Sequence, residues 1–288
     1  MSLSTTFILA PREMSDIRVK QLLKKYLARG RVVFGVAEEE FIAGFENQPQ
    51  FKTLNPGLIK SLATKSNGHL EVLEYPQSKS IEIISSLDFT RAVIINGSFH
   101  RSFHLRPEFT AIQSKGAKIK YESPFVDEDE AKTYATNHAP PPQNLDIEIT
   151  DTSIQNLIKQ TSARAFITDF QTAAAVVKNG KILALSHNLV SPYETYAWHF
   201  GISREKHQSP PGSSQHYDAT HAETAALIQA GSESNGATLY LGTFPCPHCA
   251  RNIATAGISE IVYEHDYGDP YSYTLFDRAN IKYRRFHE

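Results

Sequence analysis

The side chains best suited to chemistry in this 288-residue chain lie in two short motifs of its C-terminal half. One motif is His221-Ala222-Glu223, and the other, Pro-Cys-Pro-His-Cys, contains Cys246 and Cys249, the two cysteines of the chain. Imidazole nitrogen and thiolate sulfur are common ligands of Zn²⁺ in proteins, and three such ligands leave one position of the tetrahedron open for water. The spacing therefore predicts a catalytic Zn²⁺ site built from His221, Cys246 and Cys249.

A carboxylate stands close to this predicted metal site. Glu223 follows His221 by two residues and cannot easily bind the same ion from there. It can instead take protons from zinc-bound water and return them. We therefore predict that Glu223 is the catalytic proton shuttle. A purely structural zinc site would have no use for this carboxylate.

Three other interpretations of the two motifs remain open at this point. The cysteine pair could be a chance occurrence beside a capped helix, or a redox pair of the Cys-x-x-Cys type. His248, between the two cysteines, could supply a fourth ligand and close the site, which would make the zinc structural. The redox interpretation does not account for the neighbouring His-Ala-Glu motif.

The elements around the motifs follow a pattern that can bring them together. Residues 220–231 and 246–257 each have helical character and end in glycine, and residues 237–244 between them are typical of a strand. Two helices that each follow a strand can begin at the same edge of a sheet. The positive end of a helix also favours thiolates. Upstream, a helix is expected over 152–162, and a hairpin turning at Asn179-Gly180.

The N-terminal half has a different organisation. Short apolar runs alternate with amphipathic stretches, which predicts a mainly parallel sheet; the expected strands are 5–10, 31–37, 69–75, 91–97 and 117–122. We assign residues 1–138 to a Rossmann-like α/β domain of unknown role. Residues 139–149 contain three consecutive prolines and are assigned as a linker, followed by a zinc-dependent domain over 150–288.

One polar loop of the first domain and one basic cluster of the second each have two interpretations. Residues 96–107 carry His100, Arg101, His104 and Arg106, which could hold a phosphate at the carboxyl end of the sheet or form a solvated loop. The C-terminal cluster of Arg278, Lys282, Arg284 and Arg285 could meet a phosphate or another subunit, or be a solvated face.

Residues 150–288 resemble the cytidine deaminase superfamily, whose H-x-E and P-C-x-x-C signature they carry. The segment "TFPCPHCARNIATAGISEIVYEHDY" and the later "LFDRANI" look most like deoxycytidylate (dCMP) deaminases. This resemblance implies a three-layer α-β-α fold with a mixed five-stranded sheet, and Zn²⁺ as cofactor. It also implies a homo-oligomer.

Several residues are candidates for substrate contact. The hairpin "AAAVVKNGKILALSHN" resembles the first hairpin of the superfamily, which maps a nucleoside-contacting Asn onto Asn188. Ala222, Phe244 and Pro245 flank the metal ligands. Trp198 lies in the long connection 190–219, which could be a substrate lid in which an aromatic ring stacks on a base, or could pack locally. Tyr267 could border the pocket or simply end a strand.

The expected function is hydrolytic deamination of a cytosine-type nucleoside or nucleotide, dCMP or CMP, with zinc-bound water attacking the ring. A base in tRNA or single-stranded DNA is a second possibility, but residues after 138 are net acidic and offer no basic track. A catalytically silent zinc-binding regulatory module is a third. The absence of a membrane-length apolar run, of a secretory signal and of a disulfide framework predicts a cytoplasmic protein without membrane partners.

Overall fold

The computed structural model describes residues 4–210, 213 and 215–288. The chain divides into two compact units, which are described separately here. The first comprises Met1–Ala139 and Pro192–Asp218, and the second Pro140–Ser191 and Ala219–Glu288. The division after Ala139 falls where the prolines begin. Residues 192–218 differ from the sequence-based assignment, because they belong to the first unit although they lie between two parts of the second.

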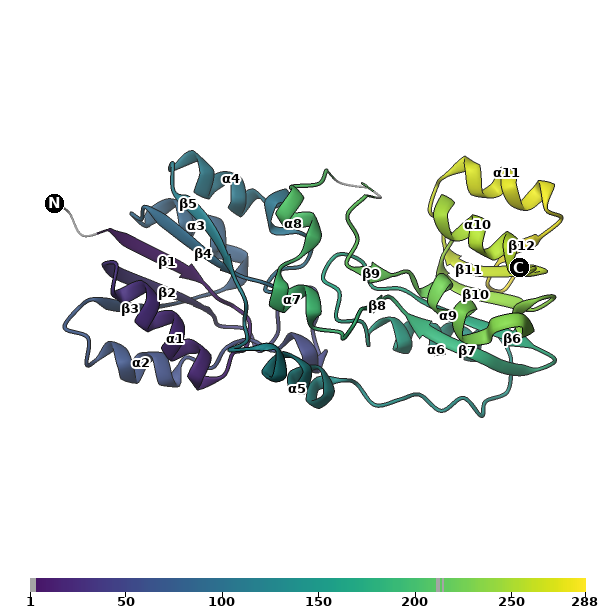
Figure 1. The fold of residues 1–288 in the computed structure, drawn as a ribbon, viewed down its shortest axis with the longest axis horizontal. Coiled ribbons are helices and arrows are strands. Elements are labelled where there is room, and N and C mark those ends of the chain that lie inside the picture. Colours follow the sequence, from purple (N-terminus) through teal and green to yellow (C-terminus); the bar gives the residue numbers. More distant parts are fainter. Residues whose placement is uncertain (1–3, 211–212, 214) are drawn as a thin grey trace. The chain divides into compact units, whose positions relative to one another are not determined.

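A five-stranded parallel sheet in the order β3-β2-β1-β4-β5 forms the centre of the first unit (Figure 1). Its strands are β1 (Thr5–Leu9), β2 (Arg31–Ala37), β3 (Leu70–Tyr75), β4 (Arg91–Ile95) and β5 (Lys118–Glu122). The strand order changes direction between β1 and β4, as in doubly wound nucleotide-binding folds. The predicted Rossmann-like α/β architecture is therefore confirmed.

Helices cover both faces of this sheet. Helices α1 (Asp16–Leu27) and α2 (Gly57–Ala63) pack on one face, and α3 (Ser80–Ser86) and α4 (Pro107–Ser114) on the other. The amphipathic pattern of α1 explains its position, because its buried residues repeat at helical spacing and Ser15 caps its first turn. Helix α5 and three short 3₁₀ helices complete the N-terminal part of the unit: Glu128–His138, Pro49–Phe51, Gln77–Lys79 and Phe103–Leu105.

Segment 192–218 adds α7 (Tyr196–Phe200) and α8 (Ser203–His207) to the first unit. Trp198 on α7 is 2% exposed and lies against Arg12, whose guanidinium carbon is 3.7 Å from the ring centroid. Gly97 has φ +72°, and a Cβ there would come within 2.9 Å of the Trp198 ring. The close approach of the indole therefore requires glycine at this position.

The second unit contains a mixed five-stranded sheet in the order β12-β11-β10-β6-β7. Its strands are β6 (Ala173–Lys178), β7 (Lys181–His187), β10 (Thr238–Thr243), β11 (Glu260–His265) and β12 (Lys282–Arg285). Strands β6 and β7 form the predicted hairpin, with Asn179 and Gly180 at φ 51° and 69°. Strands β10, β11 and β12 are parallel to one another. A separate antiparallel pair joins β8 (Leu189–Val190) to β9 (Ala219–Thr220).

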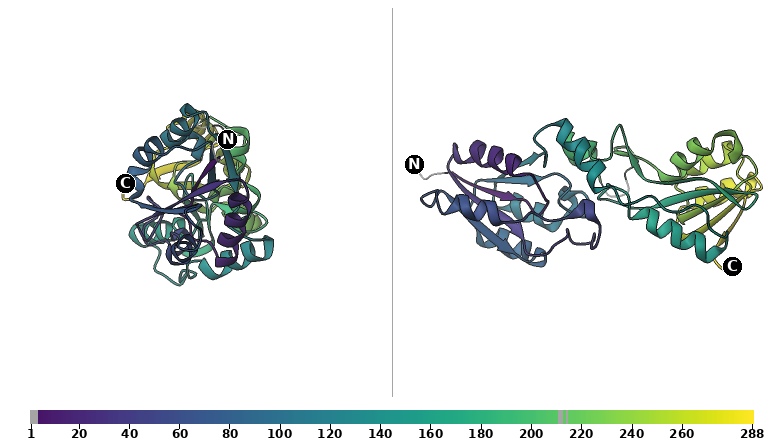
Figure 2. Two further views of the ribbon diagram at one scale, coloured as in Figure 1. Left: turned by 90° about the vertical axis from the view of Figure 1, so that its left-hand side faces the viewer. Right: turned by 90° about the horizontal axis from the view of Figure 1, so that it is seen from below.

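Helices lie on both faces of this second sheet. Helix α6 (Asp151–Ser162) packs on one face, and α9 (Ala222–Ala230), α10 (Pro247–Thr255) and α11 (Pro270–Arg278) on the other (Figure 2, right). A short 3₁₀ helix, Gly231–Ser234, follows α9. The predicted three-layer α-β-α fold with a mixed five-stranded sheet is confirmed.

Within the part of the chain that the structure describes, none of the helices combines the length and the apolar character that a membrane span requires.

Candidate metal centre and active site

Two neighbouring helices of the second unit begin at the predicted metal ligands. His221 is the N-cap residue of α9, and Cys246 is the N-cap residue of α10. Thr220, the first residue of the expected helix 220–231, instead ends β9. Neither cap residue uses its side chain to bond the backbone of its own helix. The imidazole and the thiol are therefore not used for helix capping and can bind another group.

The three predicted ligands converge on one point. The Nδ1 atom of His221 lies 3.6 Å from Sγ of Cys246 and 3.4 Å from Sγ of Cys249. One ligand atom from each of these residues lies within 4.8 Å of the other two, and they form the only such group of His, Cys, Asp and Glu found among the described residues. His248 is exposed and is not part of the group. The donor set is thus one nitrogen and two sulfurs.

The two thiols are buried, and the hydrogen bond between them alters the pKa of Cys246. Cys249 is 1% exposed and Cys246 is 7% exposed. The side-chain hydrogen bond with Cys249 lowers the pKa of Cys246 well below its usual range. Cys246 also starts a helix, where the positive end of the helix favours a thiolate. A thiolate is the form that binds metal ions, so this environment suits a ligand.

Glu223 lies in the first turn of α9 and is 6% exposed. Burial raises its pKa above the usual value. Its Oε2 atom has no hydrogen-bond partner among the described residues. A buried carboxylate oxygen without a partner is costly in a folded protein. We therefore expect the Glu223 oxygen to meet a polar group that the protein itself does not supply.

This arrangement fits Zn²⁺. The nitrogen and two sulfurs are ligands that zinc prefers, and the three residues come from two rigid helix starts. Because His248 is exposed and lies outside this group, the described residues offer three ligands, which would leave a fourth position for water. The unpartnered oxygen of Glu223 is available to such a water.

Asn188 follows β7 and holds the start of α9. Its Oδ1 atom accepts a hydrogen bond from the backbone N–H of Ala222 (2.9 Å), and its Nδ2 atom donates to the carbonyl of Phe170 (2.7 Å). Both Asn188 and Ala222 are buried. The structure therefore places Asn188 beside the His221-Ala222-Glu223 turn and shows it positioning that turn. Its contact with a nucleoside stays a prediction.

Phe244 and Pro245, the other predicted neighbours of the ligands, are both buried. The Phe244 ring stacks on Tyr273 with centroids 4.0 Å apart and lies edge-on to Tyr263. Its backbone N–H donates to the carbonyl of His265. These contacts fix the end of β10 and thereby the position at which α10 begins.

The remaining two candidates lie in different surroundings. Trp198 belongs to the first unit and is enclosed there, so its ring has no open face for a base in this structure. This placement agrees with the local-packing interpretation. Tyr267 follows β11 and is 47% exposed. Its role at a substrate pocket stays a prediction.

Two residues that support the metal ligands escaped the sequence analysis. Thr224 Oγ1 lies 3.8 Å from Sγ of Cys249, and Asn252 Nδ2 donates a hydrogen bond to the same Thr224 oxygen (3.0 Å). Their spacing was the available signal, because Asn252 stands three residues after Cys249 and Thr224 comes directly after Glu223. Such outer contacts orient metal ligands.

Comparison with known proteins relates residues 149–288 to deaminases. Residues 149–288 match the model of the MafB19-like deaminase family. The deoxycytidylate deaminase of Saccharomyces cerevisiae is 29% identical over 142 residues, 47% of this chain and 44% of the yeast protein. The ComE operon protein 2 of Bacillus subtilis is 37% identical over 65 residues, 21% of this chain and 34% of that protein. The match thus spans less than half of each of these curated relatives.

Among solved structures, a similar one is the dCMP deaminase of cyanophage S-TIM5 in complex with dCMP and dUMP. It is 24% identical to this chain, and the match covers 46% of this chain and 94% of the cyanophage chain with a TM-score of 0.39. The matched sequences and the site geometry together define the class. Over residues 149–288 the chain is similar to the cytidine deaminase-like superfamily, and within it to the MafB19-like and deoxycytidylate deaminases.

Proposed function

We propose that the second unit is a zinc-dependent hydrolytic deaminase of a cytosine-type nucleotide or nucleoside. The observation that carries this proposal is the buried Glu223, which lies beside a convergent His-Cys-Cys group and whose Oε2 atom has no hydrogen-bond partner among the described residues. A closed structural zinc site explains three of these four side chains and leaves the carboxylate unexplained. A hydrolytic site uses all four.

His221, Cys246 and Cys249 would hold the zinc ion. When bound, zinc lowers the pKa of a water molecule so that it is a nucleophile at neutral pH. Glu223 would pass one proton of the water to the ring nitrogen, and would then pass the second proton, from the hydroxyl formed on C4, to the exocyclic amine. Its raised pKa suits a group that must both accept and donate a proton. The water oxygen becomes bonded to C4 of the ring, the C4–N bond breaks, and ammonia leaves.

The cytosine-type substrate is supported by the relatives. The yeast protein is named deoxycytidylate deaminase, and so are several other matched proteins. Asn188 sits at the hairpin end, where its side chain already fixes Ala222. We propose that a nucleoside contacts the protein beside this amide. A free dCMP or CMP is favoured over a polynucleotide, because the residues after 138 are net acidic.

The setting of the protein follows from the same chemistry. Cys246 and Cys249 must stay reduced to bind zinc, so we propose that the protein works in the cytoplasm, where thiols are kept reduced. Self-association is proposed on the ground of the resemblance alone.

Replacement of Glu223 by glutamine tests the proposal. The substitution preserves size and leaves the three metal ligands intact, so the variant should keep about one zinc per chain. Ammonia release from dCMP should fall by at least about 100-fold, because general acid–base catalysis is lost. Metal content is measured by atomic emission and ammonia by a coupled assay.

Glu233→Gln is the matched control, because Glu233 is exposed in the same unit and should leave turnover unchanged. Wild-type protein is assayed with dCMP, CMP, cytidine, adenosine, tRNA and short single-stranded DNA. Ammonia release by Glu223→Gln at the wild-type rate would disprove the assigned role. Zinc-loaded wild-type protein that releases ammonia from none of these substrates would support a silent zinc module instead.

A further inference from the structure

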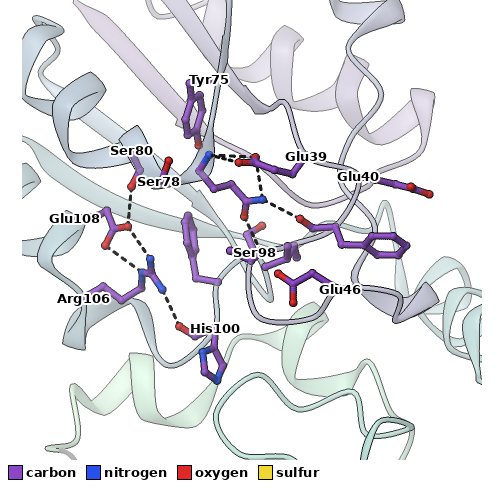
Figure 3. A pocket seen from close by; sticks show the side chains of 15 residues that line it. Glu39, Glu40, Glu46, Tyr75, Ser78, Ser80, Ser98, His100, Arg106 and Glu108 are labelled. Carbon is purple, nitrogen blue, oxygen red and sulfur yellow. Dashed lines mark hydrogen bonds and ion pairs between the residues drawn. The ribbon is translucent and has the colours of Figure 1, made fainter.

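The first unit contains a cavity of about 450 Å³ that the deaminase site does not explain (Figure 3). Its walls come from the segments that follow β2, β3 and β4, and from the start of α4. Ligands of open parallel sheets bind at the carboxyl ends of the strands, which is where this cavity lies. Its volume is in the range of small-molecule sites.

A buried hydroxyl in the cavity wall lacks a partner. Ser98 follows β4 and is 1% exposed, and its Oγ atom has no hydrogen-bond partner among the described residues. Figure 3 shows Ser98 at the centre of the lining side chains. A buried hydroxyl of this kind is expected to meet a polar atom of a bound molecule.

One side of the cavity is a neutralised charge pair. Arg106 donates from Nε and Nη2 to the Glu108 carboxylate (3.1 and 2.7 Å), and from Nη1 to the carbonyl of His100 (2.9 Å). Ser80 donates to the same carboxylate (2.8 Å). Although burial opposes it, Arg106 holds the pKa of Glu108 below its usual value. Arg106 is therefore committed to a carboxylate within the protein.

The phosphate-binding interpretation of loop 96–107 therefore receives no support from the contacts. His104 is bonded through Nδ1 to Glu205 and through Nε2 to the carbonyl of Ser209. Together with the pairing of Arg106 and Glu108, these bonds use two of the four basic side chains of the loop internally. The surroundings of the cavity are acidic instead.

Three further carboxylates line the cavity: Glu39, Glu40 and Glu46. Glu39 accepts hydrogen bonds from Gln77, and the backbone N–H of Gly44 lowers the pKa of Glu46. Because Arg106 is balanced by Glu108, these three leave the cavity negatively charged. They do not form a metal-binding group with any other His, Cys, Asp or Glu of the described residues. Their separation favours an organic molecule with several N–H or O–H donors over a metal ion.

Apolar side chains complete the lining, with Phe41, Ile42 and Phe99 alongside the polar groups. We propose that this cavity binds an unphosphorylated, neutral or cationic small molecule of about nucleoside size. Its N–H and O–H groups would face the carboxylates of Glu39 and Glu46, and an acceptor atom would receive the Ser98 hydroxyl. A phosphorylated molecule would be rejected by the same carboxylates.

Isothermal titration calorimetry on the full chain tests the proposal. The probes are adenosine and cytidine as neutral nucleosides, spermidine as a cationic amine, and AMP and CMP as phosphorylated counterparts. At least one unphosphorylated probe should bind, and AMP should bind at least 10-fold more weakly than adenosine. Comparison of the nucleosides with spermidine shows whether the N–H and O–H donors that the cavity binds belong to a nucleoside or to an amine.

Ser98→Ala should weaken this binding about 10-fold, since it removes one hydrogen bond. Ser85→Ala, at an exposed serine of α3, is the matched control and should not change it. Glu40→Lys should reduce the discrimination against AMP without affecting folding, because Glu40 is exposed. The proposal is overturned if no unphosphorylated probe binds, if AMP binds as tightly as adenosine, or if Ser98→Ala binds like wild type. Because Ser98 lies in the first unit, the binding that Ser98→Ala weakens is assigned to this cavity, and an inactive deaminase site leaves that comparison unaffected.

Discussion

At the residue scale, Glu223 is the most informative side chain, because an ionisable carboxylate is not expected in buried surroundings unless it has a function. It is buried, its pKa is raised, and one carboxylate oxygen has no partner among the described residues. Stability alone would favour an apolar side chain at such a position. Its place beside His221 and Cys246 supports the proton-transfer role that we propose for it.

Asn188 provides a prediction at the same scale. Its side chain is the hydrogen-bond partner of the Ala222 N–H, directly beside the ligand His221. Asn188→Ala should leave this N–H unpaired and let the imidazole move, so zinc affinity should fall by about 10-fold or more. Chelator competition measures the affinity. Asn156→Ala, at an exposed position of α6, is the control. Equal zinc affinity in both variants would mean that Asn188 does not position the metal ligand.

The sequence predicts this scale well where a motif names the residue type and its role. His221, Cys246 and Cys249 could be predicted to converge because of their types and spacing, and the role of Glu223 stays a prediction. Thr224 and Asn252 could not, because a hydroxyl or an amide near a ligand has many local uses and only the folded contact between α9 and α10 selects one.

At the element scale, the site depends on where helices begin. Helix α10 begins at Cys246 because Pro247 is well suited to the first turn, and α9 begins at His221. The parallel strands β10 and β11 and the packing of α9 against α10 bring the two starts together. These helices and strands were predictable from periodicity and turn residues. Their sheet order was not, because it depends on contacts between distant segments.

The tie between α6 and β12 gives a pH-dependent prediction. Asp151 accepts from both terminal nitrogens of Arg284 (2.7 and 3.1 Å) and from the backbone N–H of His287 (2.7 Å). The hydrogen bonds from Arg284 lower the pKa of Asp151 below 3.8. A lowered folded-state pKa stabilises the protein above the unfolded value, and this stabilisation is lost as the pH falls through the folded-state pKa.

Asp151→Asn should therefore reduce the free energy of unfolding by about 1 kcal/mol at pH 7, and the difference should shrink as the pH falls below the usual aspartate pKa of 3.8. Urea unfolding followed by circular dichroism measures it, and the transition of the second unit is recognised by its shift when zinc is removed. Asp146→Asn, at an exposed aspartate of the linker region, is the control. A difference that grows toward low pH would contradict the assigned cause. This ion pair also gives Arg284 a structural role within the C-terminal basic cluster.

At the scale of the whole molecule, each unit is built from segments that are not consecutive in the sequence, and the sequence does not reveal this division. Segment 192–218 leaves the second unit after β8, packs into the first, and returns at β9, directly before His221. Its aromatic composition suggested a substrate lid. The contacts of Trp198 with Arg12 and Gly97 instead make it part of the first unit. A long connection gives no local signal of the surface that it will cover.

The proposed hydrolytic function requires an open zinc site held by three protein ligands, since a closed site could not activate water. X-ray absorption at the zinc edge of the purified full chain measures the ligands directly. We predict two sulfur atoms at about 2.3 Å, one imidazole nitrogen at about 2.0–2.1 Å and one further light atom from exchangeable water. A second imidazole in place of that water, or a protein that binds no zinc, would contradict the account.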